Sequence, residues 1–347
     1  MVVSNSSYAL LLFLPLLTQA YWKREPLSTI HESSTIKGKE EPLFLSASRL
    51  ETGFIEDGQE EILIITAETR DLSETLLQRS APGRFKRLGK GHKWGGFKDK
   101  VHVVQDFLND EVEKNPDKLI IFIDSDVFFA KSCPAKQILE EYNFIKRKTG
   151  AKIVFGAELN CHENYDRENE IPKIPNWALD SKPQLKPKLN AVQNFTDRPY
   201  PQTLDFSKYG MHGDGLKYLN SGNFIGPASA LKEMVDEIGE KFYAMMSREN
   251  KDKLKRFQKE HVMKPGDQYY YWHYFLDHKD KVTLDYRGRM FQVMSFYDIR
   301  KTFELREKVL YNKFLQEDVC FAHFPGHSKE KFSREIDGYI KELNKHF

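Results

Sequence analysis

The sequence predicts an α/β domain in which a mainly parallel β-sheet is flanked by helices, and two observations carry this prediction. Continuous apolar runs, typical of buried strands, occur at residues 62–65, at residues 119–123 and within residues 151–158. Residues 101–112 carry apolar side chains at helical spacing, and residues 135–148 form a second expected helix. Because parallel strands are joined by helical crossovers, this alternation favours a parallel sheet.

The N-terminal segment, residues 1–20, is expected to be a secretory signal peptide. It is uncharged, it is apolar over residues 8–17, and it ends in Thr18-Gln19-Ala20, a pattern suited to signal peptidase. The apolar run is about half the length that a membrane span requires, so a retained anchor is the weaker alternative. Residues 21–58 lack sustained periodicity and are expected to form an irregular lead-in to a single domain at residues 59–330.

Within this domain, the first strand leads into a loop and a short helix that ends at Pro82-Gly83. Residues 90–100 contain three glycines and are expected to be irregular. Residues 163–215 are rich in Pro, Asn, Asp and Lys, and are either a functional excursion or disordered. The remaining expected elements are an ordered segment at 217–226, helices near 228–246 and from 266, strands at 281–292 and 318–324, and a charged C-terminal helix at 331–347.

Charge and cysteine content exclude several classes of protein. Fifty-three basic residues against 51 acidic residues leave a formal charge of +2, which does not favour a nucleic acid as the main partner. The three cysteines, Cys133, Cys161 and Cys320, allow at most one internal disulfide bond and are too few for a disulfide scaffold. Asn194 begins an Asn-Phe-Thr acceptor sequence, so glycosylation is expected once the chain enters the secretory pathway.

Two carboxylates follow the buried strand at residues 119–123. Asp124 and Asp126 lie at the carboxyl end of this strand, where open α/β sheets bind ligands. In an extended conformation both side chains point to the same side, so they repel one another unless a cation neutralises them. A hard divalent ion, Mn²⁺ or Mg²⁺, suits such a pair. The alternative is that the pair caps a helix or a turn, as short acidic pairs do in most proteins.

His323 ends the apolar run at residues 319–322 and offers a third ligand to the same ion. The loop after it contains Gly326, which permits close backbone approach, and Lys329, a point charge suited to phosphate. The alternative is a core histidine followed by an exposed lysine, and the sequence favours neither interpretation.

Three further segments offer polar or aromatic contacts, each with an ordinary structural alternative. Asn220, Ser221 and Gly222 can hydrogen-bond sugar hydroxyls or form a turn. Asp267 can approach an acceptor hydroxyl or cap a helix. Trp94 can stack on a planar base or pack against the protein.

Taken in order, these segments resemble the glycosyltransferase domain of the multifunctional collagen lysyl hydroxylases, from about Ile62 to Lys329. The resemblance rests on IITAET, the Trp94 loop that ends in DKV, IIFIDSDVFFA, VFGAE, YLNSGNFIG, GDQYYYWHYFLD, TLDYRGRMFQ and AHFPGHSK. The last block, together with LNSG and GDQ, is also similar to the wider group of sugar-nucleotide transferases that includes glycogenin. The resemblance implies a GT-A fold with a Rossmann-like sheet, a UDP-sugar donor and a Mn²⁺ or Mg²⁺ cofactor.

The same resemblance implies a role for each matching residue. Asp124, Asp126 and His323 would bind the metal. Because the family's acidic motif has one more residue between its aspartates, Ser125 is an alternative to Asp124 as the first ligand. The other implied roles are nucleotide binding by Thr66, Trp94, Lys100, Ser125, Gly326 and Lys329, contact with the donor sugar or acceptor by Asn220, Ser221, Gly222 and Gln268, and catalysis by Asp267 and Glu158.

The expected activity is metal-dependent transfer of a hexose, glucose or galactose, from a UDP-sugar to a hydroxyl group of a protein or glycan acceptor. Hydroxylysine is the acceptor that analogy suggests, and the secretory lumen is the expected location. Neither a nucleic-acid partner nor a stable membrane span is expected. The alternatives are a catalytically inactive sugar-nucleotide-binding module that serves as a partner or chaperone, and a nucleotide-sugar hydrolase. The sequence indicates neither the stereochemical outcome nor the oligomeric state.

Overall fold

The computed structural model describes most of the chain from residue 62 onward. The described residues are 54–55, 62–71, 75–130, 133–158, 167, 170–180, 216–246, 266–294, 303–306, 309–313, 317–325 and 333–344. Ala47–Phe347 forms one compact unit. The expected signal peptide, almost all of the expected lead-in and the glycosylation sequence at Asn194 lie outside the described residues.

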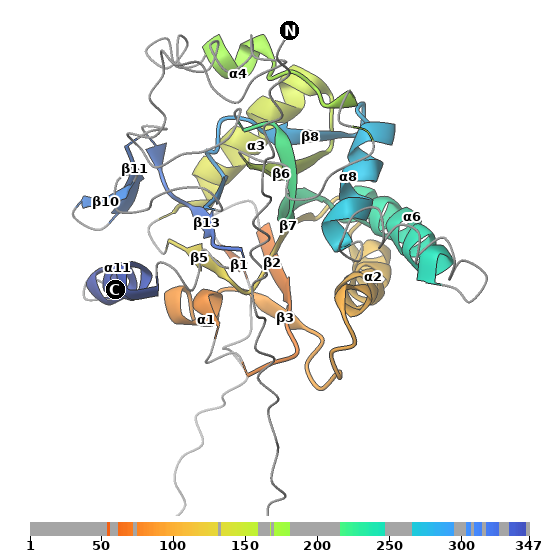
Figure 1. Cartoon of the computed structure of the whole chain (residues 1–347), viewed down its shortest axis with the longest axis horizontal. Coiled ribbons are helices and arrows are strands. Elements are labelled where there is room, and N and C mark those ends of the chain that lie inside the picture. The colour runs from red at the N-terminus through yellow and green to blue at the C-terminus, as the bar shows by residue number, and fades with distance from the viewer. Residues whose placement is uncertain are drawn as a thin grey trace, which may run out of the picture. The chain divides into compact units, whose positions relative to one another are not determined.

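The core of this unit is a mixed β-sheet whose strands follow the order β1-β2-β4-β7-β6-β9-β13-β5, with β3 paired to β2 and β8 paired to β6 (Figure 1). The strands are β1 (Phe54–Ile55), β2 (Ile62–Ala67), β3 (Lys86–Leu88), β4 (Leu119–Ile123), β5 (Val127–Phe129), β6 (Ile153–Glu158), β7 (Tyr218–Pro227), β8 (Val282–Asp285), β9 (Phe291–Val293) and β13 (Phe321–His323). The apolar runs explain the buried strands, since all residues of β6 and all but the first of β4 are buried.

Most strands of this sheet run in one direction, which confirms the α/β class. The strands that share a direction are β2, β3, β4, β6, β8, β9 and β13, whereas β1, β5 and β7 run the opposite way. The antiparallel β7 lies at the centre, between β4 and β6. Local periodicity carries no information on strand direction, so the sequence did not predict this feature.

Three helices pack together beside β7 (Figure 1): α2 (Phe97–Lys114), α6 (Ala228–Met246) and α8 (Asp267–Asp277). The apolar face expected for α2 is buried, with Val101, Val104 and Leu108 almost inaccessible. The helix begins at Phe97, four residues earlier than expected, because Gly96 adopts φ 121° and turns the chain into it. The other helices are α1 (Leu76–Ser80), α3 (Ala135–Thr149), α4 (Asn176–Asp180) and α11 (Ser333–Asn344).

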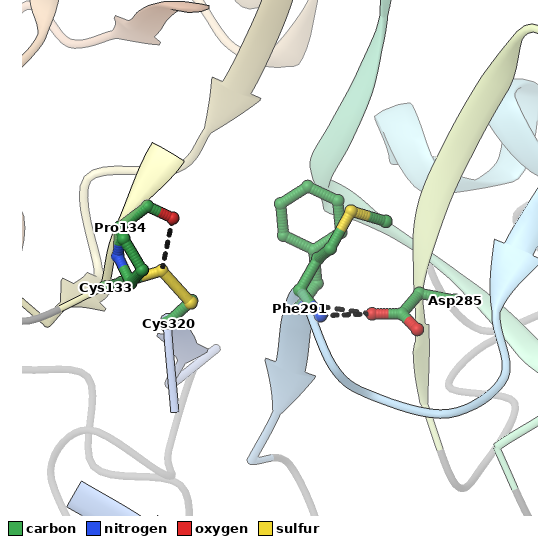
Figure 2. Close-up of a disulfide and its surroundings, with 6 residues drawn as sticks. Cys133, Pro134, Asp285, Phe291 and Cys320 are labelled. Atoms are coloured by element: carbon green, nitrogen blue, oxygen red, sulfur yellow. Dashed lines mark hydrogen bonds between the residues drawn. A yellow bond between two sulfur atoms is a disulfide. The ribbon is translucent and has the colours of Figure 1, made fainter. Parts of the chain in front are cut away.

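The single strand expected at residues 281–292 is wrong. Residues 286–290 form a turn that separates β8 from β9, and both strands run parallel to β6. The buried carboxylate of Asp285 holds this turn, since it accepts hydrogen bonds from the backbone N–H groups of Met290 at 2.7 Å and Phe291 at 3.0 Å (Figure 2). The expected strand at 318–324 is also divided: Phe321–His323 joins the main sheet, whereas Glu317–Asp318 (β12) joins a three-stranded sheet with β10 (Phe303–Arg306) and β11 (Val309–Asn312).

A disulfide bond joins Cys133, which precedes α3, to Cys320, which precedes β13 (Figure 2). The two Cα atoms are 5.1 Å apart and 187 residues separate them in the chain. Beside the bond, β13 pairs antiparallel with β5 over three residues. The bond therefore fixes the strand that ends in His323 against the strand that follows Asp126. Cys161 lies outside the described residues.

Within the described part of the chain, no helix has the length and apolar character needed to cross a membrane.

Candidate metal and nucleotide site

Asp124 and Asp126 lie in the turn between β4 and β5. The backbone N–H of Asp124 donates to the carbonyl of Gly222 in β7 at 2.8 Å, and its carbonyl accepts from the N–H of Val127 at 3.2 Å. The expectation that the two aspartates share one side of an extended strand is wrong, because residues 125–126 form a turn. This turn still brings the two carboxylates to one place, and both keep roughly a quarter of their side-chain surface exposed, 29% and 25%.

His323 reaches the two aspartates because β13 pairs with β5. In this ladder His323 lies opposite Val127, and the N–H of Phe324 donates to the carbonyl of Asp126 at 3.2 Å. The imidazole Nε2 is 3.0 Å from Asp126 Oδ1 and 3.9 Å from Asp124 Oδ2. One ligand atom from each of the three side chains can be chosen so that all lie within 4.8 Å of one another. The structure thus brings together the three side chains that the sequence singled out.

Gly222 of β7 allows His323 and Asp124 to approach each other closely, because it has no side chain. A Cβ atom at this position would lie 2.2 Å from His323 Cε1 and 2.8 Å from Asp124 Oδ2. Both distances are far below van der Waals contact, so no other residue fits without moving the histidine or the aspartate. The turn expected at Gly222 is wrong, because this residue lies within β7, packed against His323 and Asp124, while its contact with a sugar stays a prediction.

Lys100 of α2 is buried beside this group and forms two ion pairs. Its Nζ is 2.8 Å from Asp124 Oδ1 and 2.7 Å from Asp267 Oδ2. Burial by itself lowers the pKa of a lysine, but Asp124 and Asp267 outweigh burial and raise the pKa of Lys100. Lys100 is therefore charged, and it links the acidic turn to the first turn of α8.

The donor set fits a hard divalent cation. Among the described residues, Asp124 and Asp267 share the ammonium group of Lys100, and the carboxylate of Asp126 lies beside His323. Burial lowers the pKa of His323, but Asp126 and Asp124 outweigh burial and raise it. The negative field that favours a proton on this imidazole also favours a metal ion, and two carboxylates with one imidazole can hold a divalent cation.

A pocket of about 330 Å³ opens beside the aspartates. Trp94, Lys100 and Ser125, three of the residues expected to bind a nucleotide, line this pocket. Trp94 is 46% exposed and meets Phe97 edge to face with a centroid distance of 6.2 Å. Thr66, a fourth expected residue, is fully buried at the end of β2 and does not line the pocket. The described residues that line the pocket are Ala67, Glu68, Thr69, Arg70, Trp94, Phe97, Lys100, Asp124, Ser125 and Asp126.

Glu68 and Arg70 form a wall of this pocket that the sequence analysis did not identify. Ser125 Oγ donates to Glu68 Oε2 at 2.6 Å, and Arg70 donates to both carboxylate oxygens of Glu68. Burial raises the pKa of Glu68, but the hydrogen bonds from Arg70 and Ser125 outweigh burial and lower it to about 2. Ser125 is therefore engaged with Glu68, while the carboxylate of Asp124 faces His323. The signal in the sequence was a charged Glu-Thr-Arg segment directly after a buried strand.

The residues expected to contact the sugar or the acceptor lie on β7, on α8 and at the end of β6. Gln268 Nε2 donates to Glu158 Oε1 at 2.7 Å, and the N–H of Ser221 donates to Gln268 Oε1 at 3.4 Å. Asn220 Oδ1 is 2.9 Å from His323 Nδ1. Glu158 and Asp267, the expected catalytic residues, are both buried. Gly326 and Lys329 lie outside the described residues.

A comparison with models of protein families gives a match over the C-terminal part of the chain. The model of the PLOD GT domain, the glycosyltransferase domain of the procollagen-lysine dioxygenases, matches residues 192–346. This match includes β7, α8 and β13, and with them His323.

Two curated relatives extend the similarity to a larger part of the chain. "Procollagen-lysine,2-oxoglutarate 5-dioxygenase 1" of Gallus gallus is 26% identical over 254 residues, which cover 68% of this chain and 26% of that protein. "Uncharacterized protein R699" of Acanthamoeba polyphaga mimivirus is 24% identical over 258 residues, which cover 73% of this chain and 42% of that protein. The chain thus spans less than half the length of these relatives.

Among solved structures, a glycosyltransferase involved in glycosylation of the major capsid of PBCV-1 aligns with a TM-score of 0.36 and 11% identity, over 80% of this chain and 98% of that one.

Proposed function

We propose that this chain transfers a hexose from a UDP-sugar to a hydroxyl group in a metal-dependent reaction. The proposal is supported by the similarity of the chain to the glycosyltransferase domain of the collagen lysyl hydroxylases. The observation that carries the proposal is the convergence of Asp124, Asp126 and His323 at the edge of a pocket that Trp94 and Lys100 line. A site for a nucleoside diphosphate can supply ligands for a cation that neutralises the phosphates and an aromatic surface that stacks on the base. This site offers both within one pocket.

Each group of the site has a distinct task in this proposal. The two aspartates and His323 would hold a Mn²⁺ or Mg²⁺ ion. When bound, this ion would neutralise the charge that develops on the UDP leaving group as its bond to the sugar breaks. Lys100, held by Asp124 and Asp267, adds a fixed positive charge beside the same phosphates. Trp94, with nearly half of its surface exposed, would stack on the uracil.

The donor and acceptor are proposed from chemistry and from the relatives. Glucose or galactose is the proposed hexose, and a protein or glycan hydroxyl, hydroxylysine among them, is the proposed acceptor. Asp267 is the candidate base for the acceptor proton, but its carboxylate is buried and already bound to Lys100 Nζ at 2.7 Å. This arrangement favours a role for Asp267 in orienting Lys100 over a role as a strong base.

The proposed location is the lumen of the secretory pathway. An uncharged apolar segment at residues 1–20 and the Asn194 acceptor sequence support it. The Cys133–Cys320 disulfide bond supports it as well, because structural disulfides persist mainly in oxidising compartments.

The test is UDP release from a panel of UDP-sugars with Mn²⁺, in the presence and absence of peptide and glycan acceptors. Release that an acceptor accelerates is the expected result, and it should be lost in Asp126→Asn. Release that no acceptor changes would indicate a hydrolase instead. If UDP binds with Mn²⁺ but no donor is turned over, the chain is a binding module and the transferase proposal is wrong.

A further inference from the structure

The hydrogen bonds around Asn220 carry an inference about the metal site that goes beyond the ligands themselves. Asn220 lies in β7, is 2% exposed, and its Oδ1 atom is 2.9 Å from His323 Nδ1. The same Oδ1 atom accepts from the backbone N–H of Gly222 at 3.0 Å and from Asn223 Nδ2 at 3.3 Å. Three nitrogen atoms therefore surround one amide oxygen.

The backbone determines which way this amide is oriented. An N–H group of the main chain can only donate, so the side-chain atom that contacts the N–H of Gly222 must be the oxygen of Asn220 and not its nitrogen. An oxygen cannot donate, so His323 Nδ1 must carry a hydrogen to bond to it. The ring is then present with Nδ1 protonated, so in the neutral ring the lone pair lies on Nε2.

Nε2 is the atom that faces the acidic turn. It is 3.0 Å from Asp126 Oδ1, so in the neutral ring two atoms with lone pairs face each other at hydrogen-bond distance. A cation between them, a metal ion or a proton, turns this repulsion into attraction. A second hydrogen-bond partner that fixes the tautomer is typical of histidines that bind metals.

We infer that Asn220 is a positioning residue that holds His323 as the Nδ1–H tautomer with Nε2 directed to Asp124 and Asp126. This inference rests on the proposed metal-dependent function and deepens it. It gives Asn220 a role that does not depend on a sugar contact, because three nitrogen atoms surround its Oδ1 atom. Asn223, three residues further along the bulged strand, supports the arrangement by donating to the same oxygen.

The first test reads the tautomer directly. Nitrogen NMR of histidine-labelled, metal-free protein, at a pH where the ring is neutral, should show His323 with its hydrogen on Nδ1. Comparison with a His323→Gln variant assigns the signal. In Asn220→Ala the ring should shift toward the Nε2–H form that free histidine prefers, whereas Asn220→Asp retains an acceptor and should retain the wild-type tautomer. An Nε2–H ring in the wild type would overturn the inference, whether or not the protein binds metal.

The second test is Mn²⁺ affinity, measured by electron paramagnetic resonance without any nucleotide. Asn220→Ala should weaken binding by about 10–100-fold, the usual effect of removing the hydrogen-bond partner of a ligand histidine. Asn220→Asp should bind Mn²⁺ nearly as well as the wild type. A role in sugar binding alone predicts instead that Asn220→Ala leaves Mn²⁺ affinity unchanged and raises only the KM for the donor, and that result would contradict the inference.

Asn312→Ala is the matched control, because Asn312 is also fully buried and bonds through its amide, to Gln292 Oε1 at 2.9 Å. It should destabilise the fold without changing the tautomer of His323 or the Mn²⁺ affinity. Equal loss of affinity in Asn312→Ala and Asn220→Ala would show a general effect of destabilisation and would contradict the specific role. If the wild type binds no Mn²⁺, the proposed function fails, while the tautomer measurement still decides the role of Asn220.

Discussion

At the scale of single residues, the geometry of the site depends on the absence of a side chain at Gly222. His323 and Asp124 occupy the space that a side chain at Gly222 would need, and Lys100 of α2 forms an ion pair with Asp124. The carboxylates and the imidazole then lie within ligand distance of one another. Sequence patterns identify these residue types, but the clearance of a few ångströms between them is a property of the folded chain.

Gly222→Ala tests this clearance. The new methyl group would overlap the ring of His323, so the histidine or β7 must shift, and we expect a loss of about 1–3 kcal/mol in the free energy of unfolding. Mn²⁺ affinity should fall as well, because the ring can no longer face both aspartates. Gly338→Ala is the control, since a Cβ there meets nothing within 4 Å, and it should not lower stability. Wild-type Mn²⁺ affinity in Gly222→Ala would contradict the described geometry.

The lowered pKa of Glu68 makes the stability of the protein depend on pH in the acid range. Burial raises the pKa of Glu68, but Arg70 and Ser125 lower it to about 2 from the ordinary value of 4.5, so its contribution to stability is fully present above pH 4.5 and is lost as the pH falls toward 2. Glu68→Gln should lower the free energy of unfolding at pH 7 by at most about 3 kcal/mol. The loss should be smaller than this limit, because Arg70 is exposed and solvent screens its interaction with Glu68. The difference from the wild type should shrink in chemical denaturation series below pH 4.5.

Arg70→Met is the companion variant for Glu68. It keeps the carboxylate but removes its charged partner, so the pKa of Glu68 should rise and the loss of stability should begin at a higher pH. An acid transition that neither variant shifts would contradict the assigned hydrogen bonds.

At the scale of elements, the site forms where β4, β5, β7 and β13 meet. The aspartates follow β4 and precede β5, while His323 ends β13 and pairs across to Val127. Asn220 and Gly222 come from the central antiparallel β7, which contacts the acidic turn through the carbonyl of Gly222. The short β5–β13 ladder is therefore the connection on which the third ligand depends, and the disulfide bond closes it.

Removal of this disulfide bond should affect both the fold and the metal. Cys133→Ser should lower the free energy of unfolding by about 2–5 kcal/mol, because the bond closes a very long loop. Mn²⁺ affinity should also fall, since β13 is no longer tied to β5. Cys161→Ser, which leaves the Cys133–Cys320 bond in place, should retain both properties. Equal Mn²⁺ affinity in Cys133→Ser and the wild type would show that strand pairing alone positions His323.

At the scale of the whole molecule, a bound cation joins segments that are distant in the chain and should stabilise the fold. At a Mn²⁺ concentration of about 100 times its Kd, the expected gain is about 2.7 kcal/mol, because Mn²⁺ binds the folded state and not the unfolded chain. The Tm of the wild type should therefore rise by several degrees in calorimetry. Asp126→Asn should show little rise, and the same increase in both proteins would place the ion elsewhere.

The sequence by itself determined the class of fold, most of the elements and the chemical character of the site. Continuous apolar runs identified β2, β4 and β6, helical spacing identified α2, and two carboxylates after a buried strand indicated a cation. These are local properties, since burial and charge follow from residues that are neighbours in the chain. The wrong prediction of a single strand at residues 281–292 also arose from a local pattern. The apolar residues continue across a turn, and the hydrogen bonds of Asp285 that hold this turn are not visible in the sequence.

Only the tertiary structure decided the direction of β7, the partner of Lys100, the pairing of Cys133 with Cys320 and the bond between Asn220 and His323. Each of these joins atoms that lie far apart in the chain, and their contact depends on strand order and register. Periodicity within one segment carries no record of which other segment will lie beside it. The types of side chain at the site could therefore be predicted from the sequence, whereas the packing of the sheet brings the two carboxylates and the imidazole within ligand distance of one another.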